Sequence, residues 1–455
     1  MNDTADTTDL LAVTLAQTLA QEHVADIVET LNDQDDATIA HVLTELPFER
    51  AVEVLDQPEF TAAAEALALL PDQRAGSLLS AMSADRAADV FQEFDEETRA
   101  RLSGRIDRQT HSDLKKLLAY PEHSAGSIMT TEFVSVPSNW TVQQTLDHIR
   151  RVERSRETVY AIYVLDSATR KLVRAVSLRR LISGDPEAPV ESVVPAHKPI
   201  TVTPEVDRED VARLITKYDL LSVPVIDADE HVIGIVTFDD VIDAMIAETT
   251  EDVQKLGGME ALDEPYNEIG FVAMIRKRAG WLSILLLGEM LTASAMQFFQ
   301  TELEKAIVLT LFIPLIMSSG GNSGSQATSL IIRALALREI TLKDWWRVIL
   351  RELPSGLVLG SILGAIGIVR IALWQWLGFY DYGPHWMLIA ATVGGALIGI
   401  VTFGSLMGSM LPFLLKRAGF DPASASAPLV ATLVDVTGLV IYFGVAALIL
   451  SGTLL

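Results

Sequence analysis

The chain has 455 residues, no cysteine and a formal net charge of −25. This length exceeds what one hydrophobic core organises, so two to four domains are expected. Without cysteine the protein has neither disulfides nor thiolate metal ligands, which favours hard cations held by oxygen. The acidic balance makes nucleic acid an unfavourable partner.

The charge is divided unevenly along the chain. Residues 279–455 hold nine acidic and nine basic side chains, and residues 1–278 hold the other 51 acidic and 26 basic ones. The first part therefore carries the whole imbalance, and repulsion of this size opposes a compact state. Divalent cations would relieve the repulsion, so we expect folding or docking of this part to be linked to metal.

Residues 1–122 are predicted to form an acidic domain of short helical repeats. The pattern Leu-Pro-x-x-Arg-Ala at 46–51 recurs at 70–75, and proline fits the first turn of a helix. Stacked short helices that bury Leu, Val and Ala form a superhelical array. Asp85 and Asp89, four residues apart, point from one helix face; they are either a ligand pair or part of a solvated face.

Residues 123–248 contain two copies of one α/β module, at about 123–184 and 190–248. Each copy has a helix (142–152 and 208–217), two apolar strands (160–165 with 172–177, and 222–226 with 232–237) and a closing helix (178–182 and 238–246). This order resembles a pair of cystathionine-β-synthase (CBS) domains. The segment 234–240 matches that family's Gly-h-h-Ser/Thr-x-x-Asp pattern, which implies an adenine-nucleotide site, for example for ATP, at Thr237 and Asp240. The first copy has Arg180 in place of the Asp, so one nucleotide site is expected.

Acidic residues gather in the second module and in the segment after it. A connecting helix of about 241–256 is followed by a polar linker that ends near 275, and acids three and four apart share a helix face. Such a stripe repels itself unless Mg²⁺ or Ca²⁺ binds it, because both ions prefer carboxylate and water oxygens. A merely solvated acidic helix is the alternative. The acids concerned are Asp207, Glu209, Asp219, Asp240, Asp243, Glu248, Glu251 and Asp252.

Residues 276–455 are predicted to form a membrane domain of five spans, near 280–299, 306–332, 354–377, 386–415 and 428–451. Lys and Arg gather before the first span, between the second and third, and between the fourth and fifth. Under the positive-inside rule these segments are cytoplasmic. The protein is therefore expected to be multi-pass in the cell (inner) membrane, with its N-terminal domains cytoplasmic and its C-terminus outside.

The fifth span contains an acid, Asp435, about two turns past Pro428. A carboxylate at that depth is costly unless it meets water, a cation or a partner. Small neighbours, including Ala431 and Gly438, leave room for something wide to pass. We interpret Asp435 as the cation-binding residue of a pore; a protonated or hydrogen-bonded structural Asp is the alternative. One such acid per chain suggests that a second copy completes the pathway.

Two other intramembrane features allow more than one interpretation. Residues 318–326 of the second span are rich in Gly and Ser and include Asn322 and Gln326. We expect them to unwind or bend the helix and to line the pore, the alternative being a close-packing stripe of small residues. Glu289, in the first span, either faces the cavity or is a neutral acid hydrogen-bonded between helices.

Taken together, the chain resembles the MgtE family of magnesium channels over nearly its whole length. The specific matches are Gly-Gly-Asn-x-Gly-x-Gln at 320–326 and Asp421-Pro422-Ala423 followed by Pro-Leu-Val-Ala-Thr-x-x-x-Asp-x-x-Gly at 428–438. The resemblance implies a homodimer with a central pore, in which Asp435 holds hydrated Mg²⁺ near Ala431 and Gly438. It also implies regulatory Mg²⁺ sites at Glu53, Asp85, Asp89 and Asp421 and at the acids of the second CBS module and the connecting helix.

The predicted fold is thus multi-domain, with an all-α superhelical N-terminal domain, tandem α/β CBS domains and a five-helix transmembrane domain. We expect cytoplasmic Mg²⁺ to bridge the acids and close the pore. The alternatives are a secondary transporter coupled to Na⁺ or H⁺ through Glu289, and a membrane-anchored nucleotide sensor. An enzyme is not expected, because no nucleophile–base pair, P-loop or zinc spacing occurs.

Overall fold

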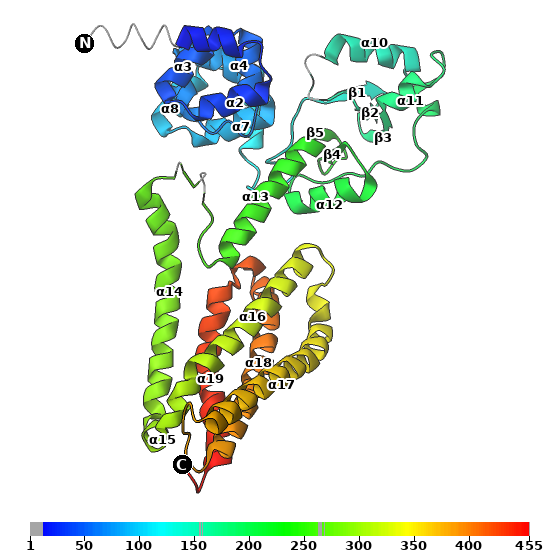
Figure 1. Cartoon of the computed structure of the whole chain (residues 1–455). Helices are drawn as coiled ribbons and strands as arrows, with labels where there is room; N and C mark the ends of the chain where they lie inside the picture. The colour runs from blue at the N-terminus through cyan, green and yellow to red at the C-terminus, as the bar shows by residue number, and fades with distance from the viewer. Residues whose placement is uncertain (1–11, 154–155, 157, 263–265, 268, 455) are drawn as a thin grey trace, which may run out of the picture. The chain divides into compact units, whose positions relative to one another are not determined.

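The computed structural model describes residues 12–454 except 154–155, 157, 263–265 and 268 (Figure 1). The start of the predicted N-terminal domain and part of the predicted linker thus lie outside the described residues. The chain forms two compact units, Met1–Ile246 and Ala247–Leu455. The structure agrees with the predicted multi-domain fold: short helices at the N-terminus, two α/β modules and five long apolar helices.

The N-terminal part is an array of short helices. Their arginines join helices that are three apart in the array: Arg74 on α6 donates to the carbonyls of Leu43 and Leu46 at the end of α3. Arg86 on α7 donates to the carbonyls of Leu55, the last residue of α4, and Phe60, in the loop that follows. All of these carbonyls except that of Phe60 lie at helix ends, where the backbone leaves acceptors unsatisfied. The repeated arginine is therefore a capping residue. The helices are α2 (Val24–Asn32), α3 (Asp36–Glu45), α4 (Phe48–Leu55), α5 (Ala63–Leu69), α6 (Asp72–Leu79), α7 (Ala84–Glu93), α8 (Glu96–Ser103) and α9 (Arg108–Leu117).

Two small sheets follow, one in each CBS module. In the first, β1 pairs in parallel with β2, and β2 pairs antiparallel with β3; in the second, β4 and β5 are antiparallel. The strands from 172, 222 and 232 have the bounds expected from the sequence. The elements are β1 (Val134–Pro137), α10 (Val142–Val152), β2 (Ala161–Leu165), β3 (Leu172–Ser177), α11 (Leu178–Ile182), η2 (Val190–Ser192), α12 (Arg208–Tyr218), β4 (Ser222–Ile226) and β5 (Val232–Thr237).

The helix that closes the second module and the connecting helix are one element. Helix α13 runs without a break over Phe238–Leu256. The two units divide within it, and Gly258 follows it with a φ of 77°. That left-handed conformation suits glycine and ends the helix.

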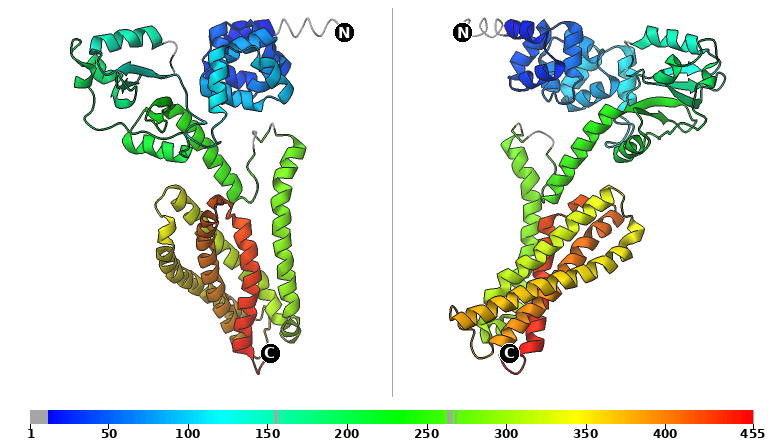
Figure 2. Two further views of the ribbon diagram at one scale, coloured as in Figure 1. Left: turned by 180° about the vertical axis from the view of Figure 1, so that it is seen from behind. Right: turned by 45° about the vertical axis from the view of Figure 1, so that its right-hand side comes forward.

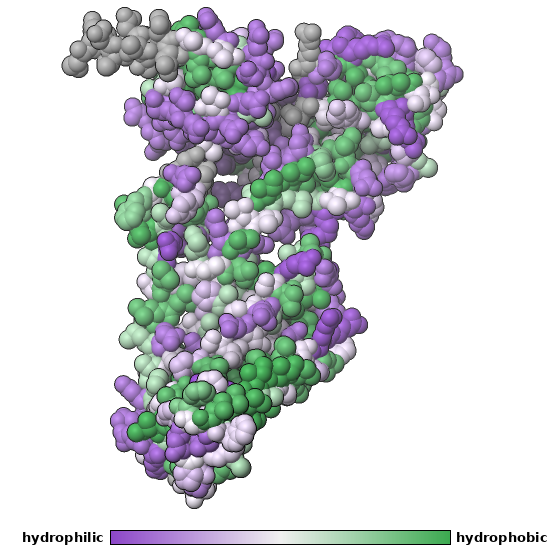
Figure 3. All heavy atoms as spheres, viewed as in Figure 1, coloured by the Kyte–Doolittle hydropathy of each residue, from purple (hydrophilic) through white to green (hydrophobic). Residues whose placement is uncertain are grey.

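Five helices in the described part of the chain are long and apolar enough to cross a membrane. Among the membrane helices, α17 packs against α18, and α16 and α19 pack against α18 and each other. Figure 3 shows apolar side chains gathered along α17 on the face in view. The elements are α14 (Phe271–Phe298), α15 (Gln300–Lys305), η3 (Ile307–Phe312), α16 (Ile313–Ala336), η4 (Leu342–Asp344), α17 (Trp345–Leu377), α18 (Trp386–Arg417), η5 (Pro422–Ser424) and α19 (Ala427–Leu450).

The Gly- and Ser-rich stretch of α16 does not unwind the helix, so that expectation was wrong. Helix α16 is continuous, and its glycines pack against α18: a Cβ on Gly404 would lie 2.4 Å from the Gly320 carbonyl oxygen. Ser323 and Ser405 share a hydrogen bond of 2.7 Å across the same contact. The hydrophobic effect does not drive helices together in lipid, because the lipid tails are equally apolar. Close backbone contact and hydrogen bonding of this kind hold a membrane bundle together instead.

Candidate functional site

Asp435 lies on the middle of α19 and is half-buried in the single chain. Its carboxylate makes no hydrogen bond or ion pair with any described residue. Of the two small residues expected beside an ion, Ala431 approaches Gly321 of α16, and Gly438 is buried facing Ile400 of α18. The helix thus packs on its small residues and leaves the carboxylate unsatisfied within one chain.

A polar stripe on α16 is exposed at the same level. Ser318, Asn322 and Gln326 recur every four residues and are all exposed, while the glycines between them are buried. Ser325 donates to the Ala427 carbonyl, and Gly321 lies against Ala431, so α16 and α19 run antiparallel. Continued by one turn, this register places Ser318 at the height of Asp435. Exposed amides on a membrane helix indicate a water-filled space or a protein partner.

Helix α14 stands beside α19 (Figure 2) and is otherwise almost uncovered. The Trp281 indole donates to Ser426 at 3.2 Å, and the rings of Phe299 and Phe443 stack at 4.8 Å. Between these contacts, a Cβ on Gly288 would meet Thr432 at 2.6 Å. The next residue, Glu289, is exposed and lies within electrostatic range of Asp435.

The end of α13 is tied to the segment that enters α19. Asp421 caps η5 by accepting from the Ala423 amide at 2.8 Å, and it accepts a hydrogen bond of 2.6 Å from the Lys255 ammonium. Lys255 also pairs with Glu251, one turn earlier on α13. Burial lowers the pKa of Lys255, but its bonds to Asp421 and Glu251 outweigh this effect and the net pKa is raised. A protein cation therefore lies among acids that the sequence suggested for Mg²⁺.

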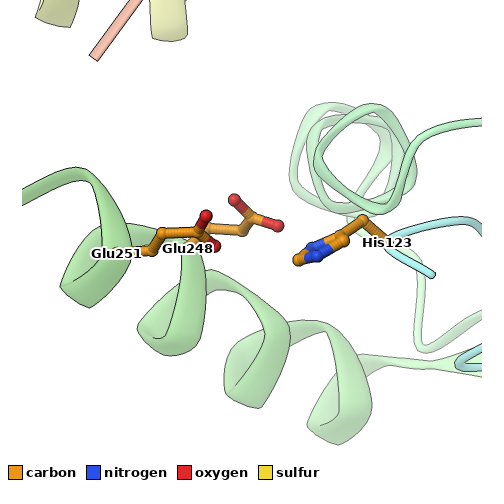
Figure 4. Close-up of side chains that lie close together, drawn as sticks. All are labelled: His123, Glu248 and Glu251. Atoms are coloured by element: carbon orange, nitrogen blue, oxygen red, sulfur yellow. The ribbon is translucent and has the colours of Figure 1, made fainter. Parts of the chain in front are cut away.

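Lys255 was missed by the sequence reasoning. Its spacing of four from Glu251 on one helix was the available signal. Four of the predicted acids are brought together here: Glu248, Glu251, Asp252 and Asp421. Figure 4 shows the side chains of Glu248 and Glu251 close together on α13. Burial, then repulsion from Asp421 and Glu248, raises the pKa of Asp252 to about 6. The cluster thus holds more negative charge than Lys255 neutralises.

The two predicted nucleotide ligands contact each other. Thr237 is buried at the end of β5, and its hydroxyl donates to the Asp240 carboxylate in the first turn of α13. Burial raises the pKa of Asp240 to about 6, the Thr237 hydroxyl opposes the shift and Asp239 adds to it. Asp240 thus lies apart from the acids at the far end of α13.

The remaining predicted acids occupy several places in the first unit. Glu53 on α4 pairs with Arg50. Asp85 and Asp89 lie one turn apart on α7; burial raises the pKa of Asp89 to about 6 despite Arg86 and Arg208. Burial and then Glu59 raise the pKa of Asp243. Three of the predicted acids lie in or next to α12. Asp207 caps its start by accepting from the Glu209 amide, Glu209 is in its first turn, and Asp219 directly follows its end with a φ of 51°.

Family models match all three parts of the chain. The model of the divalent cation transporter MgtE matches residues 313–445, and the MgtE intracellular N domain matches 22–123. The CBS domain matches 125–186 and 190–247.

Curated relatives match over most of the chain. The magnesium transporter MgtE of Thermus thermophilus is 43% identical over 371 residues, which cover 81% of this chain and 80% of the relative. That of Enterococcus faecalis is 36% identical over 74% of this chain and 71% of the relative. A crystal structure of the cytosolic domain of the Mg²⁺ channel MgtE in complex with ATP is 35% identical, with a TM-score of 0.48, over 50% of this chain and 92% of that one. The chain belongs to the MgtE family of magnesium transporters and is not an enzyme.

Proposed function

We propose that this protein is a homodimeric, Mg²⁺-selective channel of the cell membrane, lined by Asp435 and closed by cytoplasmic Mg²⁺. The observation that carries the proposal is the unpaired Asp435 carboxylate on α19, with the exposed polar stripe of α16 beside it. An acid at the centre of a membrane helix costs about 2.5–3.5 kcal/mol. A water-filled pathway with a cation in it removes that cost.

The residues of the site suit a hydrated ion. Mg²⁺ dehydrates reluctantly and keeps most of its waters in protein sites. One carboxylate per chain beside small residues offers charge and outer-shell hydrogen bonds, and the Asn322 and Gln326 amides extend the polar surface one and two turns further along α16. Such a site is weak enough to let the ion leave, as conduction requires.

A second copy of the chain would complete this pathway. Helix α14 is packed on one side only, against α19, and α16 exposes amides that a lipid face would not tolerate. A two-fold axis beside α19 would bring two Asp435 residues to one pore and cover these surfaces.

The acids at the end of α13 are the proposed sensor. Mg²⁺ bound by Glu248, Glu251, Asp252 and Asp421 would fix α13 to the entrance of α19 and hold the pore shut. Without Mg²⁺ the carboxylates repel: one pair 4 Å apart repels by about 4 kcal/mol at an effective dielectric of 20, before screening. About 5.5 kcal/mol takes a two-state equilibrium from 1:99 to 99:1. The first-unit acids would add to this effect, with the N-terminal domains on the cytoplasmic side.

A transporter coupled to Na⁺ or H⁺ is the second candidate, because Glu289 lies within range of Asp435 and could carry the coupled cation. The two mechanisms differ in what drives flux. A channel moves Mg²⁺ down its electrochemical gradient alone, whereas coupling makes flux depend on a pH or Na⁺ gradient.

Flux into proteoliposomes loaded with a Mg²⁺ indicator tests the proposal. Asp435→Asn should lower Mg²⁺ flux at least about tenfold, because the substitution removes one elementary charge per chain from the site that attracts the hydrated ion. Asp381→Asn, outside the spans' interior, is the matched control and should conduct normally. Wild-type flux in Asp435→Asn would refute the pore role. Wild-type flux that depends on a pH or Na⁺ gradient, together with loss of flux in Glu289→Gln, would favour the coupled transporter.

A further inference from the structure

An apolar pocket lies between the start of α17 and the end of α18, away from the proposed pore residues. It has a volume of about 630 Å³ and is lined by Leu342, Lys343, Trp345, Ile349, Met410, Phe413, Leu414 and Arg417. Drug-sized ligands occupy cavities of about 300–1,000 Å³ with mostly apolar walls and few polar groups. The pocket fits a molecule with a long apolar part.

Two cations on the pocket wall are unpaired. Lys343 and Arg417 form no ion pair or hydrogen bond through their side chains with the residues that the structure describes. By contrast, Arg347, on the next turn of α17, is paired with Asp344 at 3.1 Å and lies over the Trp346 ring. An apolar cavity with two free cations on its wall is complementary to a ligand with an apolar body and an anionic head.

The depth of the pocket in the bilayer is indicated by tryptophan. Trp345 and Trp346, both about half exposed, stand side by side at the start of α17. Tryptophan concentrates where the hydrocarbon meets the headgroups. The pocket also lies at the end of the membrane domain where Arg333, Arg338 and Lys416 gather. Its mouth is therefore at headgroup level, on the side that the positive charges assign to the cytoplasm.

We propose that this pocket binds one anionic phospholipid of the surrounding bilayer, with an acyl chain between α17 and α18 and the phosphate at Lys343 and Arg417. Basic pockets between membrane helices on the cytoplasmic side take anionic headgroups. Free phosphate supplies the charge but would leave the apolar wall unfilled. The site goes beyond Mg²⁺ transport, and its test does not depend on flux.

Lipid retention by the full-length protein tests this proposal. The protein is equilibrated in detergent with equal amounts of palmitoyl-oleoyl phosphatidylglycerol and phosphatidylcholine, and retained lipids are counted by native mass spectrometry. The wild type should retain one phosphatidylglycerol per chain, about tenfold or more in preference to phosphatidylcholine, since each nearby cation strengthens the attraction. Lys343→Gln/Arg417→Gln should abolish that preference, and excess inorganic phosphate should not displace the lipid.

Two further variants separate the charge from the cavity. Ile349→Trp fills the pocket while keeping both cations, so it should lose the bound lipid. Arg276→Gln/Arg278→Gln removes the same charge from α14 and should retain lipid as the wild type does. Equal retention of the two lipids by the wild type, or unchanged retention in both pocket variants, would overturn the proposal. A wild type that keeps no lipid, together with a dimer that Ile349→Trp dissociates, would assign the pocket to a subunit contact and overturn it as well.

Discussion

The ammonium group of Lys255 lies 2.6 Å from the carboxylate of Asp421, joining the last turn of α13 to the residue that leads into α19. Both side chains are partly exposed, at 24% and 38%. A contact of this kind contributes about 0.2–1 kcal/mol. It is therefore strong enough to bias a gate and weak enough for a divalent ion to replace it.

Replacing Lys255 by Gln should make closure depend more on Mg²⁺. Without the tethered cation, Glu251, Asp252 and Asp421 repel one another, so flux at low internal Mg²⁺ should rise by up to roughly fivefold, the equivalent of about 1 kcal/mol. Saturating Mg²⁺ should still close the pore. Proteoliposome flux over a series of internal Mg²⁺ concentrations measures this, with Lys217→Gln on α12 as the equal-charge control. A Lys255→Gln curve that overlies the wild-type curve would show that the contact has no part in gating.

The contact between α16 and α18 should be intolerant of a single added methyl group. A Cβ on Gly408 would lie 2.1 Å from the Gly324 carbonyl oxygen, whereas a Cβ on Gly444 of α19 meets nothing within 4 Å. Gly408→Ala should therefore lower stability by about 1–3 kcal/mol, the usual cost of overpacking. Thermal unfolding of the detergent-solubilised protein compares the two variants. Equal melting temperatures for Gly408→Ala and Gly444→Ala would mean that the helices separate without cost.

The same glycines show where prediction from the sequence succeeds and where it fails. Local patterns suffice for β3, β4 and β5, because apolar strands between turn residues leave few alternatives. For residues 318–326, glycine content alone cannot distinguish an unwound helix from a packed one, since the answer depends on what faces it. Gly404 and Gly408, about 80 residues later in the chain, supply that partner. A membrane environment also removes the water that would otherwise stabilise unwound backbone.

In the candidate site, too, local features could be predicted from the sequence and contacts between distant residues could not. The sequence indicates Asp435 because an acid inside an apolar span is unusual wherever its neighbours lie. It does not indicate that Lys255 reaches Asp421, because the two are 166 residues apart and the bond depends on the fold. Glu53, chosen from the family resemblance, and Asp240, chosen from the CBS motif, prove to be engaged with Arg50 and Thr237. Charge shows which residues could bind a cation, and packing decides which are available.

Acidification should partly replace Mg²⁺ in closing the gate. In the docked arrangement the pKa of Asp252 is raised from 3.8 to about 6, first by burial and then by Asp421 and Glu248. Asp252 therefore takes up a proton when the end of α13 packs against the segment that leads into α19, at pH values between 3.8 and 6. This packing becomes more favourable as the pH falls through 6. Lys255, whose pKa is raised, keeps its charge over this range.

We accordingly expect less Mg²⁺ to be needed for closure at pH 5.5 than at pH 7, measured as half-maximal inhibition of flux. Asp252→Asn removes the titrating carboxyl together with one proposed Mg²⁺ ligand, so its closure should respond less to acidification than that of the wild type. Asp229→Asn, on an exposed turn of the second CBS module, is the control. An undiminished pH response in Asp252→Asn would assign the effect to other acids.

Nucleotide binding should depend on Thr237 and not on its counterpart in the first module. The Thr237 hydroxyl donates to Asp240, which holds the pair at the junction of β5 and α13. Ser177 occupies the matching position at the end of β3 but makes no side-chain cap, and Arg180 stands where the acid would be. Hydrogen bonds to charged groups contribute about 1.5–3 kcal/mol. Thr237→Val should therefore weaken ATP binding by about 10- to 100-fold, whereas Ser177→Ala should leave it unchanged.

Calorimetric titration of the full-length protein with ATP measures both affinities. Thr237 is buried directly before α13, so its replacement could lower the stability of the protein in general and imitate a loss of ligand contact. Thr237→Ser keeps the hydroxyl and should restore binding if that group is what matters. Weak binding in Thr237→Ser at wild-type melting temperature, or equal effects of Thr237→Val and Ser177→Ala, would place the nucleotide elsewhere. The sequence difference between the modules, Asp240 in the second and Arg180 in the first, would then have no effect on nucleotide binding.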